Sequence, residues 1–178
     1  MDKQDLRNLW WSLVIMYLAL IYATLGAAPI IWDAVDDFLG GKGVFAVFVA
    51  GSIAGIAILA YMASIKKERS VNNYLLLMLF AFMFLVLNKL AVFAVDKVHL
   101  IEYAVLSVLV YNALRIDLDR FDIRLYVIGS LVCLLAGFVD ESLQCVMPDR
   151  YFDWRDIWLN ALSSITAFGV IRYNILKR

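Results

Sequence analysis

The chain has 178 residues, of which 64% are apolar and only 18% are charged. A soluble domain of this size cannot bury so much apolar surface, so lipid must cover part of it. The 16 basic and 16 acidic residues cancel, so the net charge gives no indication of a nucleic-acid partner.

Apolar runs long enough to cross a membrane recur along the whole chain. A hydrocarbon core about 30 Å thick needs about 20 apolar residues in a helix. We therefore expect one all-α membrane domain over residues 1–178, a polytopic transmembrane helical bundle of about six helices. The expected spans are 9–28, 44–65, 74–95, 98–114, 125–144 and 157–175.

The basic residues predict the orientation of these spans. If the N-terminus is cytoplasmic, 11 Lys and Arg residues fall on the cytoplasmic side and 5 on the outer side. Cytoplasmic loops carry the excess of Lys and Arg, so both termini are expected in the cytoplasm. The cytoplasmic residues are Lys3, Arg7, Lys66, Lys67, Arg69, Arg115, Arg120, Arg124, Arg172, Lys177 and Arg178, and the outer residues are Lys42, Lys89, Lys97, Arg150 and Arg155.

Three polar clusters map to the outer face in this topology. They lie where the fourth span begins, where the fifth ends, and just before the sixth. Within each, polar residues recur at helical spacing and line one helix face. The clusters contain Asp96, Lys97, His99, Glu102 and Tyr103; Asp140, Glu141 and Gln144; and Arg150, Asp153, Asp156 and Asn160.

Ionisable residues at membrane depth are costly and usually face the bundle interior, where they mark a functional site. The plain alternative is a solvated loop face with helix caps, in which Asp96 and Asp156 are ordinary acids of a first helical turn. Because three helix ends carry such stripes on the same side, we favour one connected pocket. Lys97 and Arg150 are the expected partners of its surplus carboxylates.

The residue types suggest two sets of roles. Acid–base catalysis needs a proton-transfer group with a partner that orients it, and a guanidinium binds phosphate through two parallel hydrogen bonds. The candidate catalytic residues are His99, Glu102, Asp140 and Glu141. The candidate substrate-binding residues are Asp96, Lys97, Tyr103, Gln144, Arg150, Asp153, Asp156 and Asn160.

The same motifs resemble the VanZ-like family of small bacterial membrane proteins. The family pattern has an acidic–basic pair, a His and a Tyr, then Asp-Glu-x-x-Gln, then Pro-x-Arg-x-x-Asp-x-x-Asp-x-x-x-Asn. The resemblance covers residues 94–169, with departures at Asp149, Ser163 and Ala167, where Gly is common in the family. The matching residues are Asp96, Lys97, His99, Tyr103, Asp140, Glu141, Gln144, Pro148, Arg150, Asp153, Asp156 and Asn160.

The family is named for a protein linked to resistance to teicoplanin, a glycopeptide that acts outside the cell. The resemblance therefore implies a role in the cell envelope and a place in the bacterial cytoplasmic (inner) membrane. It identifies no reaction and does not assign antibiotic resistance to this chain.

Three readings of the pocket stay open. The first is an enzyme that acts on an envelope lipid or lipid-linked headgroup by acid–base or metal-assisted chemistry. The second is a non-catalytic binder, a small transporter or a proton relay. The third is a metal site, because His99 with Glu102, Asp140 and Glu141 is rich in nitrogen and oxygen ligands. A single His gives only weak support for zinc, and a divalent cation that bridges to phosphate is the form of this reading left open.

The orientation can be tested by labelling single cysteines in intact cells, with Cys133 and Cys145 replaced beforehand. Lys42→Cys and Asp149→Cys should react with a membrane-impermeant thiol reagent, and Lys67→Cys should react only after the cells are permeabilised. The reverse pattern would contradict the assigned orientation.

Overall fold

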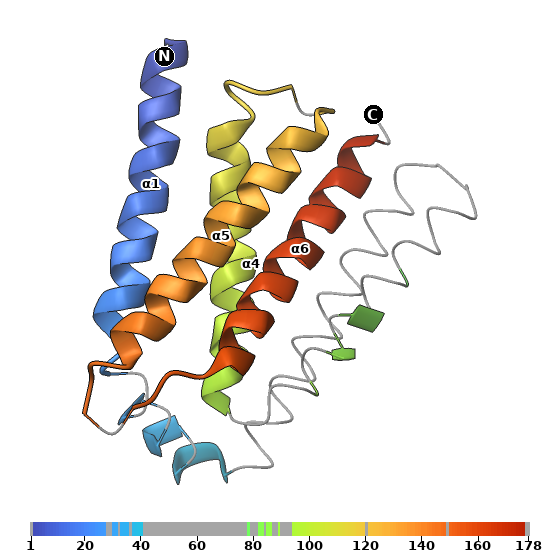
Figure 1. The fold of residues 1–178 in the computed structure, drawn as a ribbon. Coiled ribbons are helices and arrows are strands. Elements are labelled where there is room, and N and C mark those ends of the chain that lie inside the picture. Colours follow the sequence, from blue (N-terminus) through green and yellow to red (C-terminus); the bar gives the residue numbers. More distant parts are fainter. Residues whose placement is uncertain are drawn as a thin grey trace.

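Four long helices form most of the structure (Figure 1): α1 Lys3–Thr24, α4 Ala94–Leu114, α5 Ile123–Gln144 and α6 Trp154–Leu176. Residues 30–31, 33–35 and 37–40 are also helical, and no strand occurs among the residues that the structure describes. The predicted all-α bundle is therefore confirmed.

The computed structural model describes residues 2–27, 30–31, 33–35, 37–40, 78, 82–83, 85–86, 89, 94–119, 121–148 and 150–176, with the backbone alone at 94–97 and 173–176. The predicted span 44–65 and most of 74–95 lie outside the described residues. The six-span topology stays a prediction.

Side-chain caps explain where three of these helices begin. Asp2 accepts a hydrogen bond at the start of α1 and forms a capping box with Asp5. Asp122 accepts one from the backbone N–H of Arg124 at the start of α5. Asp153 does the same for Arg155, at 2.8 Å, at the start of α6. Each cap satisfies a backbone N–H that has no partner within its helix.

Helix α4 packs against α1, α5 and α6. Successive described helices run in opposite directions (Figure 1). The beginnings of α4 and α6 therefore lie at the same end of the bundle as the ends of α1 and α5. This is the end at which the three polar sequence clusters occur.

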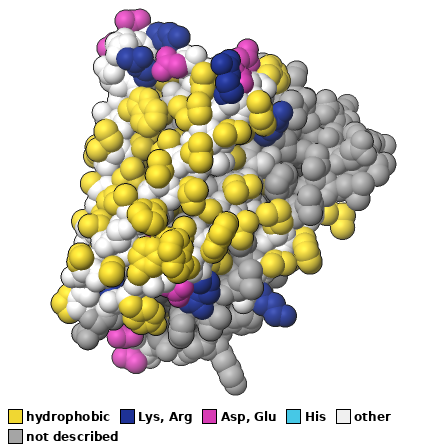
Figure 2. All heavy atoms as spheres, in the orientation of Figure 1, with side chains coloured by type: hydrophobic (Ala, Val, Ile, Leu, Met, Phe, Trp, Pro, Cys, Tyr) yellow, Lys and Arg dark blue, Asp and Glu magenta, His cyan; other side chains and the backbone are white. Residues whose placement is uncertain are grey.

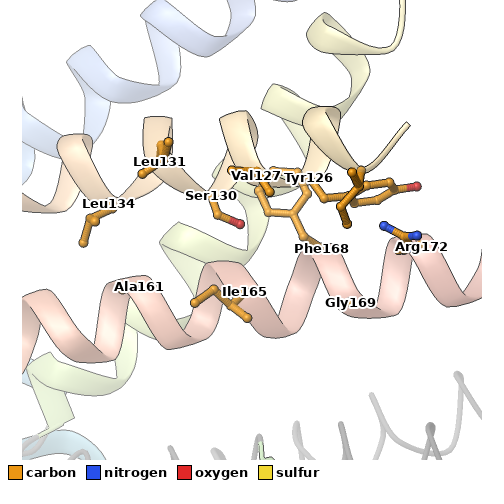
Figure 3. Close-up of a pocket in the computed structure, with 11 residues that line it drawn as sticks. Tyr126, Val127, Ser130, Leu131, Leu134, Ala161, Ile165, Phe168, Gly169 and Arg172 are labelled. Atoms are coloured by element: carbon orange, nitrogen blue, oxygen red, sulfur yellow. The ribbon is translucent and has the colours of Figure 1, made fainter. Parts of the chain in front are cut away.

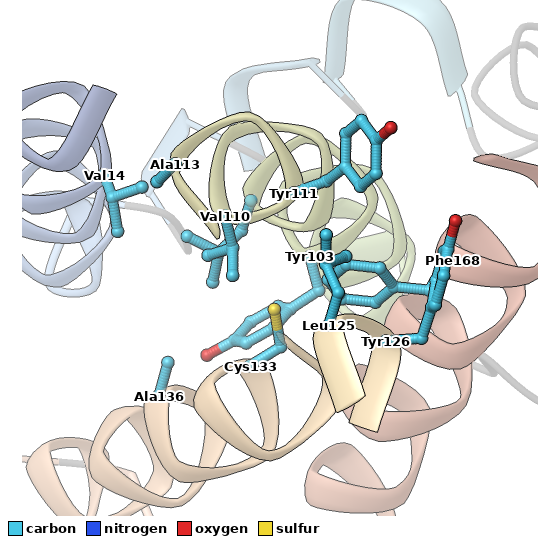
Figure 4. Close-up of a cluster of buried hydrophobic side chains, with 11 residues drawn as sticks. Val14, Tyr103, Val110, Tyr111, Ala113, Leu125, Tyr126, Cys133, Ala136 and Phe168 are labelled. Atoms are coloured by element: carbon cyan, nitrogen blue, oxygen red, sulfur yellow. The ribbon is translucent and has the colours of Figure 1, made fainter. Parts of the chain in front are cut away.

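The core between these helices is tightly packed (Figure 4). Tyr103, Leu106 and Val110 of α4 are fully buried, as are Leu125 and Cys133 of α5. Cys133 and Cys145 are both free cysteines.

The outer surface of the bundle is apolar. Met16, Leu131 and Leu135 are more than half exposed, and apolar side chains cover the middle of the face in Figure 2, with charged side chains gathered toward its two ends. Two described helices, α1 and α5, are long and apolar enough to cross a membrane. These features support a membrane protein.

One close approach of α5 to α6 depends on a glycine. A Cβ atom at Gly129 would lie 2.3 Å from Cζ of Phe168. Phe168 is 2% exposed, and its ring meets the ring of Tyr126 edge-on. The Phe168 ring therefore has little room to move away.

We expect Gly129→Ala to lower the free energy of unfolding, because overpacking costs about 1–3 kcal/mol and exceeds the gain in helix propensity of up to about 1 kcal/mol. The measurement is thermal unfolding of the purified protein in detergent. Gly26→Ala is the matched control, since nothing lies within 4 Å of a Cβ atom there. Equal melting of Gly129→Ala and the parent would contradict this packing.

Candidate functional site

The candidate site lies where α4 begins, α5 ends and α6 begins. His99 comes from the first turns of α4, Asp140 and Glu141 from the last turn of α5, and Arg150 from the segment that joins α5 to α6. The antiparallel arrangement of α4 and α5 brings His99 and Asp140 together, although they are 41 residues apart in the sequence.

An imidazole and two carboxylates form the first part of the site. Nδ1 of His99 lies 3.5 Å from Oδ2 of Asp140 and 3.5 Å from Oε2 of Glu102. Tyr103 donates a hydrogen bond of 3.1 Å to the same oxygen of Asp140. His99 is 4% exposed, and Tyr103 and Asp140 are fully buried, so these three side chains are shielded from solvent, while Glu102 is partly exposed.

The amide of Gln144 links the first part of the site to the second. Its Nε2 donates to Oε1 of Glu141 at 2.9 Å and more weakly to Oδ1 of Asp140 at 3.4 Å. Its Oε1 accepts a hydrogen bond from the guanidinium of Arg150. The backbone N–H of Asp153 donates to Oε2 of Glu141 at 3.2 Å. Both oxygens of the Glu141 carboxylate are thereby hydrogen-bonded.

Arg150 was expected to pair with a carboxylate, and the described residues show no such pair. No carboxylate of a described residue lies within 4.0 Å of its guanidinium, which donates to Gln144 instead. The Gln144 amide can form hydrogen bonds with both groups, because its nitrogen donates to Glu141 while its oxygen accepts from Arg150. The arginine therefore reaches the carboxylates only through Gln144.

The acids at the start of α6 have structural roles of their own. Asp153 precedes the helix and caps it, and its carboxylate lies 3.5 Å from the guanidinium of Arg155. Asp156 is in the first turn and lies 3.8 Å from the same guanidinium. The first-turn position is the one expected for an ordinary helix acid.

Asn160 of α6 lies deeper in the bundle, where α6 packs against α4 and α5. It is fully buried, and neither atom of its amide has a hydrogen-bond partner among the described residues. A Cβ atom at Gly137 would lie 3.2 Å from Cβ of Asn160 and 3.5 Å from the ring of Tyr103. Gly137 thus gives Asn160 its space, and a buried amide without partners is costly unless a ligand or water completes it.

A small cleft borders the site between α1 and α4. Its volume of about 20 Å³ is room for about one water molecule or metal ion. Apolar side chains form one wall, and His99, Glu102 and Arg150 supply the polar groups. The other described lining residues are Ile21, Thr24, Leu25 and Val98.

A larger groove of about 390 Å³ lies elsewhere, between α5 and α6 (Figure 3). Its walls are mostly apolar, with Ser130 and Arg172 among the polar exceptions. The guanidinium of Arg172 lies 5.0 Å from the centre of the Tyr126 ring. Its described lining includes none of the predicted site residues and no carboxylate or imidazole for acid–base chemistry.

The structure brings most of the predicted site residues into one bonded network, and their chemical roles stay predictions. Asp156 and Asn160 adjoin the network. The side chains of Asp96 and Lys97 lie outside the described residues. The connected residues are His99, Glu102, Tyr103, Asp140, Glu141, Gln144, Arg150 and Asp153.

Sequence reasoning missed the contribution of α1. Tyr22 donates a 3.0 Å hydrogen bond to the backbone oxygen of Ala136, one turn before Asp140, and Thr24 lines the cleft. The available signal was two polar residues at the end of an otherwise apolar span, on the same side as the three clusters.

Comparison with known proteins agrees with the motif reading. Residues 13–177 match the VanZ/LLP1 family, which is nearly the whole chain. No curated protein and no solved structure matches it. The family match extends well beyond the residues that carry the polar motifs, back into α1. The chain belongs to the VanZ/LLP1 family.

Proposed function

We propose that this VanZ/LLP1 protein acts on the polar headgroup of an envelope lipid or lipid-linked molecule at the outer face of the bacterial cytoplasmic membrane. The observation that carries the proposal is the position of the buried imidazole–carboxylate network. It borders a cleft that also has apolar walls. A lipid requires this combination, since its chains favour apolar surface and its headgroup needs polar partners.

The side chains around the cleft fit a phosphate-bearing or hydroxyl-bearing headgroup. Arg150 is half-buried, lines the cleft and is not paired with a described carboxylate. Its guanidinium is therefore available to bind phosphate if it leaves Gln144. The amide of Asn160 offers both a donor and an acceptor for a hydroxyl group.

The catalytic groups in this proposal are His99 and the carboxylates beside it. Covalent catalysis is less well supported, because a nucleophile has to lie within hydrogen-bond reach of its base. No Ser or Cys of the described residues is hydrogen-bonded to His99. Proton transfer to or from the substrate, or to a water molecule, fits the groups present.

The cleft as it stands is too small for a headgroup. Binding therefore requires α1 to move away from α4, or Arg150 to swing outward. Leu20, near the end of α1, is more than half exposed, which supports an opening that faces lipid in the proposed topology. The substrate would then enter from the membrane rather than from the aqueous phase.

We expect His99→Ala and Glu141→Gln to abolish activity while the protein still folds, because a positioned acid–base group contributes about 10²–10⁴-fold to the rate. Arg150→Ala should mainly weaken substrate binding, by about 10–100-fold, as expected for loss of a charged hydrogen bond. The assay incubates each protein with lipids extracted from bacterial membranes and follows the lipid species by mass spectrometry. Folded yield is measured alongside.

Arg124→Ala is the matched control for the arginine, because Arg124 lies at the far end of α5, is mostly exposed and pairs with Asp122. It should behave as the parent does. If His99→Ala, Glu141→Gln and Arg150→Ala all lose folded yield together, the network is a structural clamp between helices. That result would contradict the proposed function.

A further inference from the structure

We propose that His99, Asp140 and Glu141 form a binding site for one divalent metal ion. The proposal deepens the proposed function, on which it rests for the role of the ion: His99, Asp140 and Glu141 would act as ligands, and the ion would hold a phosphate in the cleft. Binding of the ion itself can be tested without a substrate.

The geometry is close to that of a metal centre. One ligand atom from each of the three residues can be chosen so that all lie within 4.8 Å of one another. Ligands that share an ion at about 2.0–2.2 Å lie within about 4.4 Å of one another. Side-chain movements of about a few tenths of an ångström would therefore close the site.

Charge gives an independent reason for an ion. Asp140 and Glu141 are consecutive residues and are both fully buried. No Lys or Arg nitrogen of the described side chains lies within 4.0 Å of either carboxylate. The imidazole of His99, 3.5 Å from Asp140, can offset at most one of these two neighbouring buried negative charges, whereas a divalent ion would offset both.

The imidazole of His99 also has a buried nitrogen without a hydrogen-bond partner among the described residues. His99 is 4% exposed and lies beside Asp140 and Glu102, yet its Nδ1 has no hydrogen-bond partner among the described residues. A ring nitrogen that faces carboxylate oxygens, and is shielded from water, is suitably placed to ligate a metal through its lone pair.

Neighbouring groups would orient the ligands. Tyr103 donates to the carboxylate of Asp140, while Gln144 and the backbone N–H of Asp153 donate to that of Glu141. Hydrogen bonds of this kind are a regular feature of metal centres, because they fix the ligand orientation and tune its basicity.

The ligand set indicates the class of ion. One imidazole nitrogen and two carboxylate oxygens suit a borderline or hard divalent ion such as Mn²⁺, Fe²⁺ or Zn²⁺. Three protein ligands leave coordination positions open, as in catalytic centres. The small cleft beside His99 and Glu102 has room for a metal-bound water molecule or a phosphate oxygen.

The test adds Mn²⁺ alone to the full-length protein, purified with an affinity tag that contains no histidine. Electron paramagnetic resonance should show one Mn²⁺ bound per chain, with modulation from a directly coordinated ¹⁴N nucleus. His99 is the single histidine of the chain, so growth with ¹⁵N-histidine should replace the ¹⁴N signal with that of ¹⁵N. This experiment identifies the ligand without any mutation.

Substitutions at the proposed ligands provide a second test of the metal site. His99→Gln and Asp140→Asn should each weaken Mn²⁺ binding by at least about tenfold, since even the loss of an outer-shell partner costs 10–100-fold. Asp122→Asn is the matched control, because Asp122 lies at the other end of α5 and pairs with Arg124, and it should bind as the parent does. Absence of stoichiometric binding, or binding without a histidine signal, would overturn the proposal.

The cation site and the proposed function fail in different ways. If the chain alters bacterial lipids equally well with EDTA and binds no Mn²⁺, the cation site is overturned while the proposed function stands. If Mn²⁺ binds through His99 but no lipid species changes, the cation site stands and the proposed function fails.

Discussion

The structure depends on the burial of two neighbouring carboxylates at the end of α5. Asp140 and Glu141 are both fully buried, and burial of ionised groups is unfavourable unless each oxygen finds a partner. Tyr103 and Gln144 donate hydrogen bonds to these carboxylates, and the imidazole of His99 lies 3.5 Å from the carboxylate of Asp140. These residues come from two helices, so the charge requirement determines how the end of α5 meets the beginning of α4.

Contacts from the other helices support this packing of α5 against α4. Gly137 leaves room for Asn160 of α6 beside Tyr103 of α4, and Tyr22 of α1 binds the backbone of α5 one turn before the carboxylates. The opposite end has a different character, with an aromatic cluster and exposed arginines such as Arg124. The polar and ionisable groups of the site are thus gathered at one end of an apolar bundle, which is the arrangement that the proposed function requires.

Much of this arrangement could be predicted from the sequence. Apolar composition and polar stripes at helical spacing indicated an all-α bundle with its polar residues at one end. The choice of partner within the site could not be predicted, because helical spacing gives the face of a residue but not its distance to other helices. Arg150 therefore binds Gln144 rather than a carboxylate. The part played by α1 was missed for the same reason: Tyr22 is 114 residues from Ala136, and only the packed bundle brings them together.

On this interpretation the buried network binds a ligand and does not only hold the helices together. The most direct measurement is an experimental structure in nanodiscs made from bacterial lipids. We expect density for a polar headgroup in the cleft bordered by His99, Glu102 and Arg150, with Arg150 turned from Gln144 toward that density. A closed cleft, with the network intact and lipid density confined to the apolar groove between α5 and α6, would contradict it.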